Sequence, residues 1–216
     1  MKLYIYDHCP YCVKARMIFG LKNVDVDIVT LLNDDEEKPK SMIGKKMVPI
    51  LEKEDGSYMP ESMDIISYID ENYGDEKIIN SSKNEEIGQW LSESREYVYK
   101  LAMPRWIKCE LEEFKTQSAI DYFQKKKEGM IGSFEDNLKE SDKLIGQANN
   151  HLKKLAELLH SEESAEEEIS ETDIHLFPAL RSLTVVEGIE FPEKVFNYLK
   201  NMSDKTEIIL HFNVAV

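Results

Sequence analysis

Residues 2–12 read KLYIYDHCPYC, and this stretch decides how the first part of the chain folds. Lys2 to Tyr6 is a short run of aromatic and β-branched character, which is typical of a β-strand. Pro10 suits the first position of a helix, because the N–H that proline lacks would have no partner there. The stretch therefore predicts a strand, a turn that carries two cysteines, and a helix that continues to about Lys22.

The residues that follow predict more short elements of both kinds. Alternating apolar and acidic residues indicate a second strand, a valine–proline pair opens a third, and an Asp-Gly turn leads into a fourth. Two further helices are expected, one ending near Gly44 and one running from Ser62 to Gly74. The three strands are expected at residues 24–29, 48–51 and 57–59. The order βαβ followed by ββα predicts a mixed four-stranded sheet with helices, which is an α/β fold.

Beyond residue 84 the sequence shows helical periodicity and almost no strand signal. We therefore expect an α/β plus all-α chain, with a first domain at 1–75, a linker at 76–85 and an all-helical domain at 86–216. One helix start, at Ser170, is well marked, because this capping hydroxyl stands three residues before the carboxylate of Asp173. The apolar stretch at 208–212 predicts a docking tail or a short helix.

Charge and hydropathy exclude several classes of function. The formal net charge is −15, from 42 acidic against 27 basic residues. A general nucleic-acid binder needs a basic face, and docking on an anionic membrane needs one as well. No apolar run approaches the ~20 residues that span a bilayer, and the start MKLYIYDHCP does not resemble a signal peptide. We expect a cytoplasmic protein that binds neither nucleic acid nor membrane.

The pair Cys9 and Cys12 raises three possibilities: a metal site, a structural staple or a redox site. A structural zinc site needs four ligands, but the only other cysteine is Cys109, and there is no second Cys-x-x-Cys. A Cys-x-x-Cys near a βαβ pattern in a cytosolic chain is typical of a redox motif. The sequence favours redox exchange with no bound metal, and it predicts that Cys109 is a small buried residue.

The position of Cys9 gives this pair a chemical role. If Pro10 is the first helical residue, Cys9 is the N-cap, and its sulfur faces unpaired amides at the positive end of the helix dipole. We expect these amides to hold the pKa of Cys9 well below its usual ~8.5. A stabilised thiolate is also a good leaving group when a mixed disulfide is resolved, which is the behaviour of an exchange catalyst.

With these residues in view, the sequence resembles the glutaredoxins. The tetrapeptide Cys-Pro-Tyr-Cys after a first strand is the dithiol motif of that family. Met47-Val48-Pro49 looks like the family's loop with a cis-proline, and residues 60–65, PESMDI, look like the glutathione-binding turn shared with glutathione transferases. Met103-Pro104-Arg105-Trp106 and the capped helix at Ser170 extend the likeness to two-domain bacterial glutaredoxins. The resemblance implies a thioredoxin-like first domain and a helical domain like that of glutathione transferases.

The resemblance also implies a glutathione site. The backbone of Val48, ahead of Pro49, would pair with the cysteine portion of the tripeptide like an added strand. The Glu61 carboxylate would receive the γ-glutamyl ammonium, and the Ser62 hydroxyl with nearby helix N–H groups would receive its carboxylate. Tyr11 would cover the sulfur. Glutathione is then a co-substrate, and no tightly bound cofactor is expected.

Further expectations concern neighbouring residues. His8 is expected to face solvent beside the active site, and Lys22 or Lys45 is a candidate for the glycine carboxylate of glutathione. Arg105 is expected to form a salt bridge across the domain interface.

The predicted function is a glutathione-dependent thiol–disulfide oxidoreductase that acts through Cys9 and Cys12. Its expected partners are glutathione and oxidised or glutathionylated proteins, and its expected state is a monomer. Two alternatives stay open at this point: a glutathione transferase that conjugates glutathione to electrophiles, and a redox-sensing interaction module without turnover.

Overall fold

The N-terminal part of the protein is a four-stranded sheet with three helices. The structure is a computed structural model that describes residues 1–74 and 76–216. The strands lie in the order β2-β1-β3-β4, with β1 parallel to β2 and β3 antiparallel to both of its neighbours. The mixed sheet expected from the sequence is therefore confirmed. In chain order the elements are β1 (Lys2–Ile5), α1 (Pro10–Leu21), β2 (Asp27–Thr30), α2 (Glu37–Ile43), β3 (Ile50–Glu52), β4 (Tyr58–Pro60) and α3 (Ser62–Asn72).

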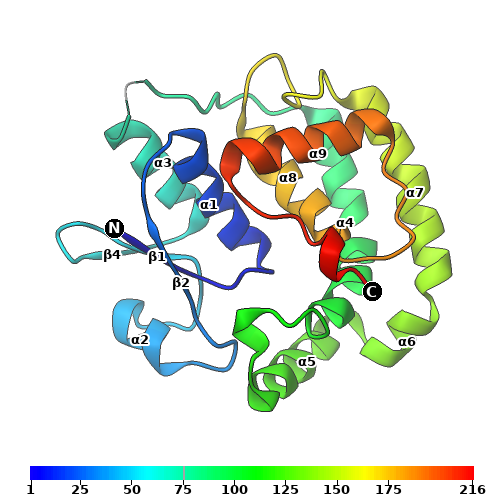
Figure 1. Cartoon of the computed structure of the whole chain (residues 1–216), viewed down its shortest axis with the longest axis horizontal. Coiled ribbons are helices and arrows are strands. Elements are labelled where there is room, and N and C mark those ends of the chain that lie inside the picture. The colour runs from blue at the N-terminus through cyan, green and yellow to red at the C-terminus, as the bar shows by residue number, and fades with distance from the viewer. Residues whose placement is uncertain (75) are drawn as a thin grey trace.

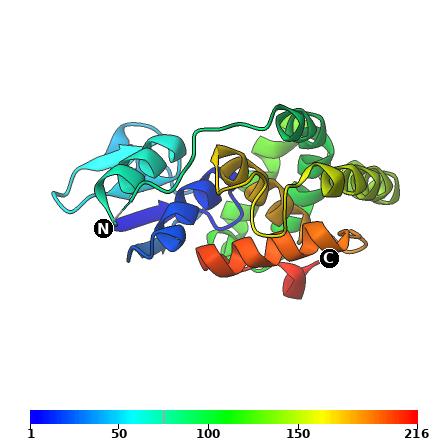
Figure 2. The same cartoon turned by 90° about the horizontal axis from the view of Figure 1, so that it is seen from above.

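The rest of the described chain is helical, which confirms the second half of the expected fold class. Figure 1 shows the sheet and its helices on one side and the helical part on the other, and Figure 2 shows one extended segment passing between them. Its helices are α4 (Glu85–Trp106), α5 (Gln117–Ile131), α6 (Phe134–Lys139), α7 (Ser141–Leu158), α8 (Glu171–Leu183) and α9 (Glu193–Thr206), with short 3-10 turns at Glu112–Phe114 and Phe212–Val214. No helix among the residues described is long and apolar enough to cross a membrane.

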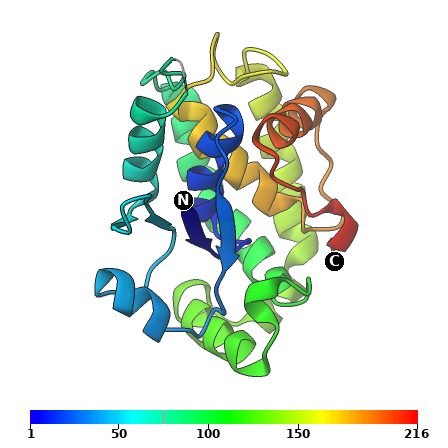
Figure 3. The same ribbon diagram turned by 60° about the vertical axis from the view of Figure 1, so that its left-hand side comes forward.

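Helix α1 is the element that joins the two halves. It packs on α3 within the N-terminal part and on α8 and α9 of the helical part, as Figure 3 shows. The approach to α9 is close, since a Cβ added at Gly20 would lie 2.6 Å from the Cα of Thr206. One hydrophobic cluster runs through α1 into both halves. The N-terminus of α1 is thereby held by packing from both sides.

Two strands begin at least two residues later than expected, each for a local reason. Residue 24 was expected to open the second strand, but its N–H closes the end of α1 by donating to the Phe19 carbonyl at 2.8 Å. Asn23, with φ of 52°, supplies the left-handed residue of this Schellman-type helix end. Strand β3 begins at Ile50, after a cis peptide bond between Val48 and Pro49.

The capped helix and the chain end are also resolved by the structure. Ser170 and Asp173 form a reciprocal capping box at the start of α8, as expected. The apolar end of the chain is a docked tail that also contains a short 3-10 turn. Within it Ile208 is buried, and the N–H of Val216 donates to the Val185 carbonyl at 3.0 Å.

Candidate active site

Cys9 lies where β1 passes into α1, at the N-cap of the helix. Its backbone is extended, with φ of −71° and ψ of 118°, and its carbonyl accepts the first helical hydrogen bond from Val13 at 3.0 Å. This is the position expected from Pro10 at the first helical residue. Cys9 is partly buried, Cys12 is fully buried in the first turn, and both are free thiols.

The pKa of Cys9 is lowered to about 6, but not mainly by the groups expected from the sequence. The largest contribution is a hydrogen bond from the Cys12 thiol, which outweighs the opposing effect of burial. The charge of His8 comes next, and the amides of Cys12 and Tyr11 contribute least. In the described chain no amide donates to the Cys9 sulfur with helix-capping geometry. The expectation of an anion held chiefly by free amides is therefore wrong in its cause, although the direction of the shift agrees.

Cys12 is shifted in the opposite direction. Burial raises its pKa well above the usual value, and the hydrogen bond to Cys9 and the charge of that neighbour raise it further. The backbone N–H of Tyr6 lies 3.5 Å from its sulfur and opposes the shift only weakly. At neutral pH the pair therefore holds one proton, on Cys12, and one negative charge, on Cys9.

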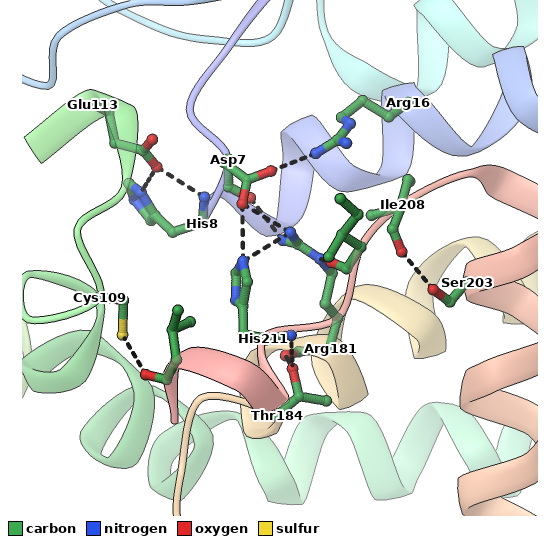
Figure 4. Close-up of polar contacts among 12 residues, drawn as sticks. Asp7, His8, Arg16, Cys109, Glu113, Arg181, Thr184, Ser203, Ile208 and His211 are labelled. Atoms are coloured by element: carbon green, nitrogen blue, oxygen red, sulfur yellow. Dashed lines mark hydrogen bonds and ion pairs between the residues drawn. The ribbon is translucent and has the colours of Figure 1, made fainter. Parts of the chain in front are cut away.

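His8 is buried, which corrects the expectation that it faces solvent. Its side chain is 6% exposed and lies among the rings of Trp106, Phe114 and Phe123. The imidazole Nδ1 lies 2.7 Å from Oε1 of Glu113, and the backbone N–H of His8 donates to the same oxygen at 2.9 Å (Figure 4). The helical half thus supplies a carboxylate directly behind the residue that precedes Cys9.

Glu113 was missed by sequence reasoning. It stands in an acidic pair before Phe114, where a solvent-exposed turn is the usual interpretation, yet its side chain is fully buried. Burial alone would raise its pKa, but the hydrogen bonds and charge of His8 outweigh this and lower it, so the carboxylate is ionised.

Asp7 anchors the same loop to the other half of the protein. Its carboxylate accepts from Arg16 at 2.6 Å and from Arg181 at 2.8 Å, and it lies 2.9 Å from Nε2 of His211 (Figure 4). Burial alone would raise the pKa of Asp7, but the hydrogen bond with His211 and the charges of Arg181 and Arg16 lower it far below its usual value. Asp7 is therefore charged at neutral pH.

Arg181, not Arg105, is the arginine that crosses between the two halves. Arg105 was expected there, but its hydrogen bonds go to the carbonyls of Leu101 and Val216 and to the Ser141 hydroxyl, all in the helical half. The sequence did carry a signal for Arg181. It falls in step with the buried residues Ile174 and Phe177 on the apolar face of α8, where a charged side chain needs a buried partner.

The structure brings Val48 and Pro49 to the cysteine pair. Tyr4 of β1 is paired with Ile50 of β3, so the two residues before Ile50 lie beside the end of β1, which leads into Cys9. Val48 precedes its strand, and its backbone is outside the β1–β3 ladder. Val48 and Cys9 line the same cavity.

Glu61 and Ser62 lie at the start of α3. Ser62 is the first helical residue and is buried, whereas Glu61 is exposed and occupies a left-handed conformation with φ of 69°. Such a conformation is costly for a residue other than glycine and is found mostly where a site demands it. The first amides of α3 have no partner within the helix, so they are available to an anion.

A cavity lies beside Cys9 and is rich in lysine. Cys9 and Val48 line it together with Lys46, Lys126 and Lys127. Neither lysine suggested from the sequence lines it: Lys22 is held at the far end of α1, where its Nζ lies 3.2 Å from the Asp70 carboxylate, and Lys45 points to solvent. Lys126 and Lys127 are neighbours in α5, and only the meeting of α5 with the loop before β3 brings Lys46 to them.

Burial confirms the expectation for Cys109, the third cysteine. Trp90 and Trp106 are core residues, and Cys109 is buried with its thiol 3.1 Å from the Arg105 carbonyl. Burial raises the pKa of Cys109 to about 11, so this third cysteine carries no charge near neutral pH. Among the residues described, no group of three or more His, Cys, Asp or Glu is placed to hold a metal ion.

Comparisons with known proteins agree with this geometry. Residues 86–215 match the family described as glutaredoxin 2, C-terminal domain, and residues 3–77 match the glutathione S-transferase N-terminal domain. Glutaredoxin 2 of Escherichia coli strain K12 is 48% identical over 216 residues, which is 100% of both chains. A crystal structure of glutaredoxin 2 from Salmonella typhimurium in complex with glutathione superposes with a TM-score of 0.97 at 48% identity, over 100% of this chain and 98% of that one.

More distant structures share the fold alone. A glutathione S-transferase from Rhodospirillum rubrum is 16% identical, with a TM-score of 0.62 over 94% of this chain and 86% of that one. The full-length identity to the curated relatives and the match of most of the helical half carry the assignment. The chain belongs to the glutaredoxin 2 family.

Proposed function

We propose that this glutaredoxin works through Cys9 as the attacking thiolate and Cys12 as the resolving thiol. As a member of its family the protein is a glutathione-dependent thiol–disulfide oxidoreductase that uses glutathione as co-substrate. The observation that supports the two roles is the opposite shift of the two thiols, with the pKa of Cys9 lowered to about 6 and that of Cys12 raised well above its usual value. Two like groups whose pKa values are pushed apart take different roles in catalysis.

With a glutathionylated protein, the Cys9 thiolate attacks the sulfur of glutathione. A Cys9–glutathione disulfide forms as the bond to the substrate cysteine breaks, and the substrate leaves as a thiolate that takes a proton from water. A second glutathione thiolate then attacks the adduct, which releases oxidised glutathione and restores Cys9. The low pKa of Cys9 serves this last step, because a stable thiolate is a good leaving group.

With a protein disulfide, Cys9 attacks one sulfur of the substrate and forms a mixed disulfide with it, while the substrate S–S bond breaks and its second sulfur leaves as a thiolate that takes a proton from water. Cys12 then attacks the Cys9 sulfur and gives its proton to the departing substrate thiolate, so the substrate leaves fully reduced and Cys9–Cys12 becomes a disulfide. Two molecules of glutathione reduce that disulfide in turn. Burial keeps Cys12 protonated until the mixed disulfide has replaced the neighbouring negative charge.

The proposed glutathione site runs from the cis-Pro49 loop to the start of α3. Val48 offers its backbone beside Cys9, and Glu61 with Ser62 offers a carboxylate, a hydroxyl and free helix amides to the γ-glutamyl group. Tyr11 is the proposed cover of the sulfur. The lysine-lined cavity beside Cys9 fits the glycine carboxylate at the opposite end of the tripeptide. A relative with 48% identity was crystallised with glutathione, which supports a site for the same tripeptide in this protein.

The roles of the two cysteines are tested by replacing each one with serine. Cys12→Ser should reduce glutathione mixed disulfides and fail to reduce protein disulfides, whereas Cys9→Ser should fail at both. Turnover is followed as oxidation of NADPH by glutathione reductase, with Cys109→Ser as the matched control for loss of a buried thiol. Full turnover by Cys9→Ser would refute the assignment.

Two rival functions are tested in the same assay series. Glutathione transferases share this fold at low sequence identity, and a shared fold alone does not show a shared activity. In this chain Cys9 occupies the junction between the first strand and the first helix. Conjugation of a chloronitrobenzene faster than mixed-disulfide reduction would favour the transferase. A Cys9–Cys12 disulfide that forms without any turnover would favour a sensing module.

The remaining proposals concern the substrates, the cellular compartment, the oligomeric state and the domain boundaries. Oxidised and glutathionylated proteins are the proposed substrates, and the cytoplasm, where glutathione is abundant, is the proposed compartment. The proposed state is a monomer divided at residues 75 and 86, which sedimentation and limited proteolysis would test.

A further inference from the structure

A second cavity adjoins the redox motif, and Val48 does not line it. Pro10 and Tyr11, the two residues between the cysteines, form one wall of it, and α4 and α8 form the others. None of the residues proposed for glutathione lines this cavity except Tyr11. The motif thus adjoins two cavities, and a ligand in this one would lie beside Pro10 and Tyr11, the two residues that follow Cys9.

Three nitrogen-bearing side chains line this cavity, and no carboxylate does so among the residues described. They are Lys14 of α1, Arg95 of α4 and His175 of α8. The Nζ of Lys14 lies 2.6 Å from Nδ1 of His175 and 5.2 Å above the ring of Tyr11, so at least one of its protons has no partner in the described chain. The nearby carboxylate of Glu171 pairs with Lys83 at 2.9 Å and lies 3.5 Å from Nε2 of His175.

Arg95 is the most available of these cations. It is exposed, and within the described chain it makes neither a hydrogen bond nor an ion pair. Burial of Lys14 is the main cause that lowers its pKa to about 8, and the positive charge of Arg95 lowers it further. Although the protein has a net charge of −15, this cavity carries an excess of positive charge. It would attract an anion, and the anion would in turn stabilise the protonated form of Lys14.

The rest of the lining is apolar and the cavity is small. Leu91, Val98 and Pro178 supply hydrocarbon surface below the cations. The volume is about 110 Å³, whereas sites for drug-sized ligands usually measure ~300–1,000 Å³. A space of this size suits one or two side chains of a polypeptide better than a free small molecule.

We propose that the cavity beside Pro10 and Tyr11 binds an acidic side chain of the protein substrate, next to the substrate's disulfide-bonded cysteine. Lys14 and Arg95 pair with the carboxylate, and the apolar floor receives its methylenes or an apolar neighbour. This inference rests on the proposed function and names a substrate class for it: oxidised or glutathionylated proteins with Glu or Asp beside the target cysteine. Glutathione occupies the Val48 side while the protein part of the mixed disulfide occupies this one.

The test compares three glutathionylated peptides that differ only in the residue after the cysteine, which is Glu, Gln or Lys. The wild-type protein should show a kcat/KM about 3- to 10-fold higher for the Glu peptide than for the Gln peptide, as one partly screened ion pair allows. Arg95→Gln should reduce this preference at least twofold, and Arg95→Glu should reverse it in favour of the Lys peptide. Lys153→Gln, on the exposed face of α7, removes the same charge far from the cavity and should change nothing.

A small substrate separates failure of this proposal from failure of the proposed function. The mixed disulfide of glutathione and 2-mercaptoethanol does not reach the cavity, so the Arg95 variants should reduce it at the wild-type rate. Absence of turnover with that substrate would refute the proposed function itself. Turnover of it together with equal kcat/KM for all three peptides would refute only the acidic-substrate cavity. Competitive inhibition by phenylacetate without discrimination among the peptides would overturn the proposal in favour of a small-molecule site.

Discussion

Replacement of Cys12 by alanine tests what holds the Cys9 thiolate. The hydrogen bond from the Cys12 thiol is the largest cause of the low pKa of Cys9, which lies at about 6 instead of 9.0. This difference corresponds to about 4 kcal/mol in favour of the thiolate, at ~1.4 kcal/mol per unit. A hydrogen bond to a charged group contributes ~1.5–3 kcal/mol of stabilisation, so its loss should raise the pKa of Cys9 by about 1–2 units.

The shift changes the charge of the site at neutral pH. With a pKa of about 6, roughly nine-tenths of Cys9 is thiolate at pH 7, whereas a pKa of about 7.5 leaves roughly a quarter. The Cys12→Ser variant is the matched control, because its hydroxyl still donates to the anion. We therefore expect Cys9 to have nearly the same pKa in the parent and in Cys12→Ser. In Cys12→Ala the pKa of Cys9 should be clearly higher.

The assay is the absorbance of the thiolate at 240 nm between pH 4 and 9. In that window the signal belongs to Cys9, because the pKa of Cys109 is raised to about 11 and that of Cys12 lies well above its usual value. The pH dependence of alkylation by iodoacetamide gives an independent reading. If Cys12→Ala titrated at the parent pKa while His8→Gln titrated higher, the charge of His8 would be the main support of the thiolate, and the role assigned to the Cys12 hydrogen bond would be wrong.

Three other predictions concern stability and are read from urea unfolding. Gly20→Ala should lower the free energy of unfolding by about 1–3 kcal/mol, because the new methyl group meets the Thr206 backbone. The same change in an open helix stabilises a protein by up to ~1 kcal/mol, so a stabilised variant would disprove the close approach of α1 to Thr206. Asp7→Asn should cost about 3 kcal/mol near pH 7 by leaving the buried Arg181 unpaired. Because the pKa of Asp7 is lowered in the fold, its contribution is present above the unfolded value of ~3.9 and fades as the pH falls, so parent and variant should converge in acid. Burial lowers the pKa of His211, so the unfolded chain binds more protons than the folded protein below pH ~6.5, and the free energy of unfolding falls there. His211→Gln should therefore flatten the dependence of the free energy of unfolding on pH between pH 7 and 5. An unchanged slope would exclude this histidine as its source.

Much of the architecture was predictable because it depends on neighbours in the chain. Pro10 fixes the start of α1, and Gly44, with φ of 75°, ends α2 as expected of a glycine after a helix. The capping box of Ser170 and Asp173 uses groups three residues apart. Such features involve one or two turns of backbone, so residue types and spacing are sufficient to identify them.

Local sequence patterns did not predict the first residue of strand β2. Residues 24–29 alternate as a strand should, yet Val24 is used by the closing turn of α1 and only Asp27–Thr30 joins the ladder. A strand forms its hydrogen bonds with a neighbouring strand, so the first residue of β2 is set by its register with β1 and not by the side chains of β2.

The amino-acid sequence alone determined that Cys9 occupies the N-cap position of a helix with Cys12 one turn later, because both positions follow from Pro10 and the preceding strand. Only the tertiary structure decided what surrounds them. Glu113 reaches His8 across 105 positions of sequence, and Arg181 reaches Asp7 across 174. Periodicity can say that a side chain faces the core, but which group it meets there depends on how the helical half packs against α1. The position of the thiolate and the groups that lower its pKa therefore lie in the local chain, whereas the partners that hold His8 and Asp7 are a property of the assembled fold.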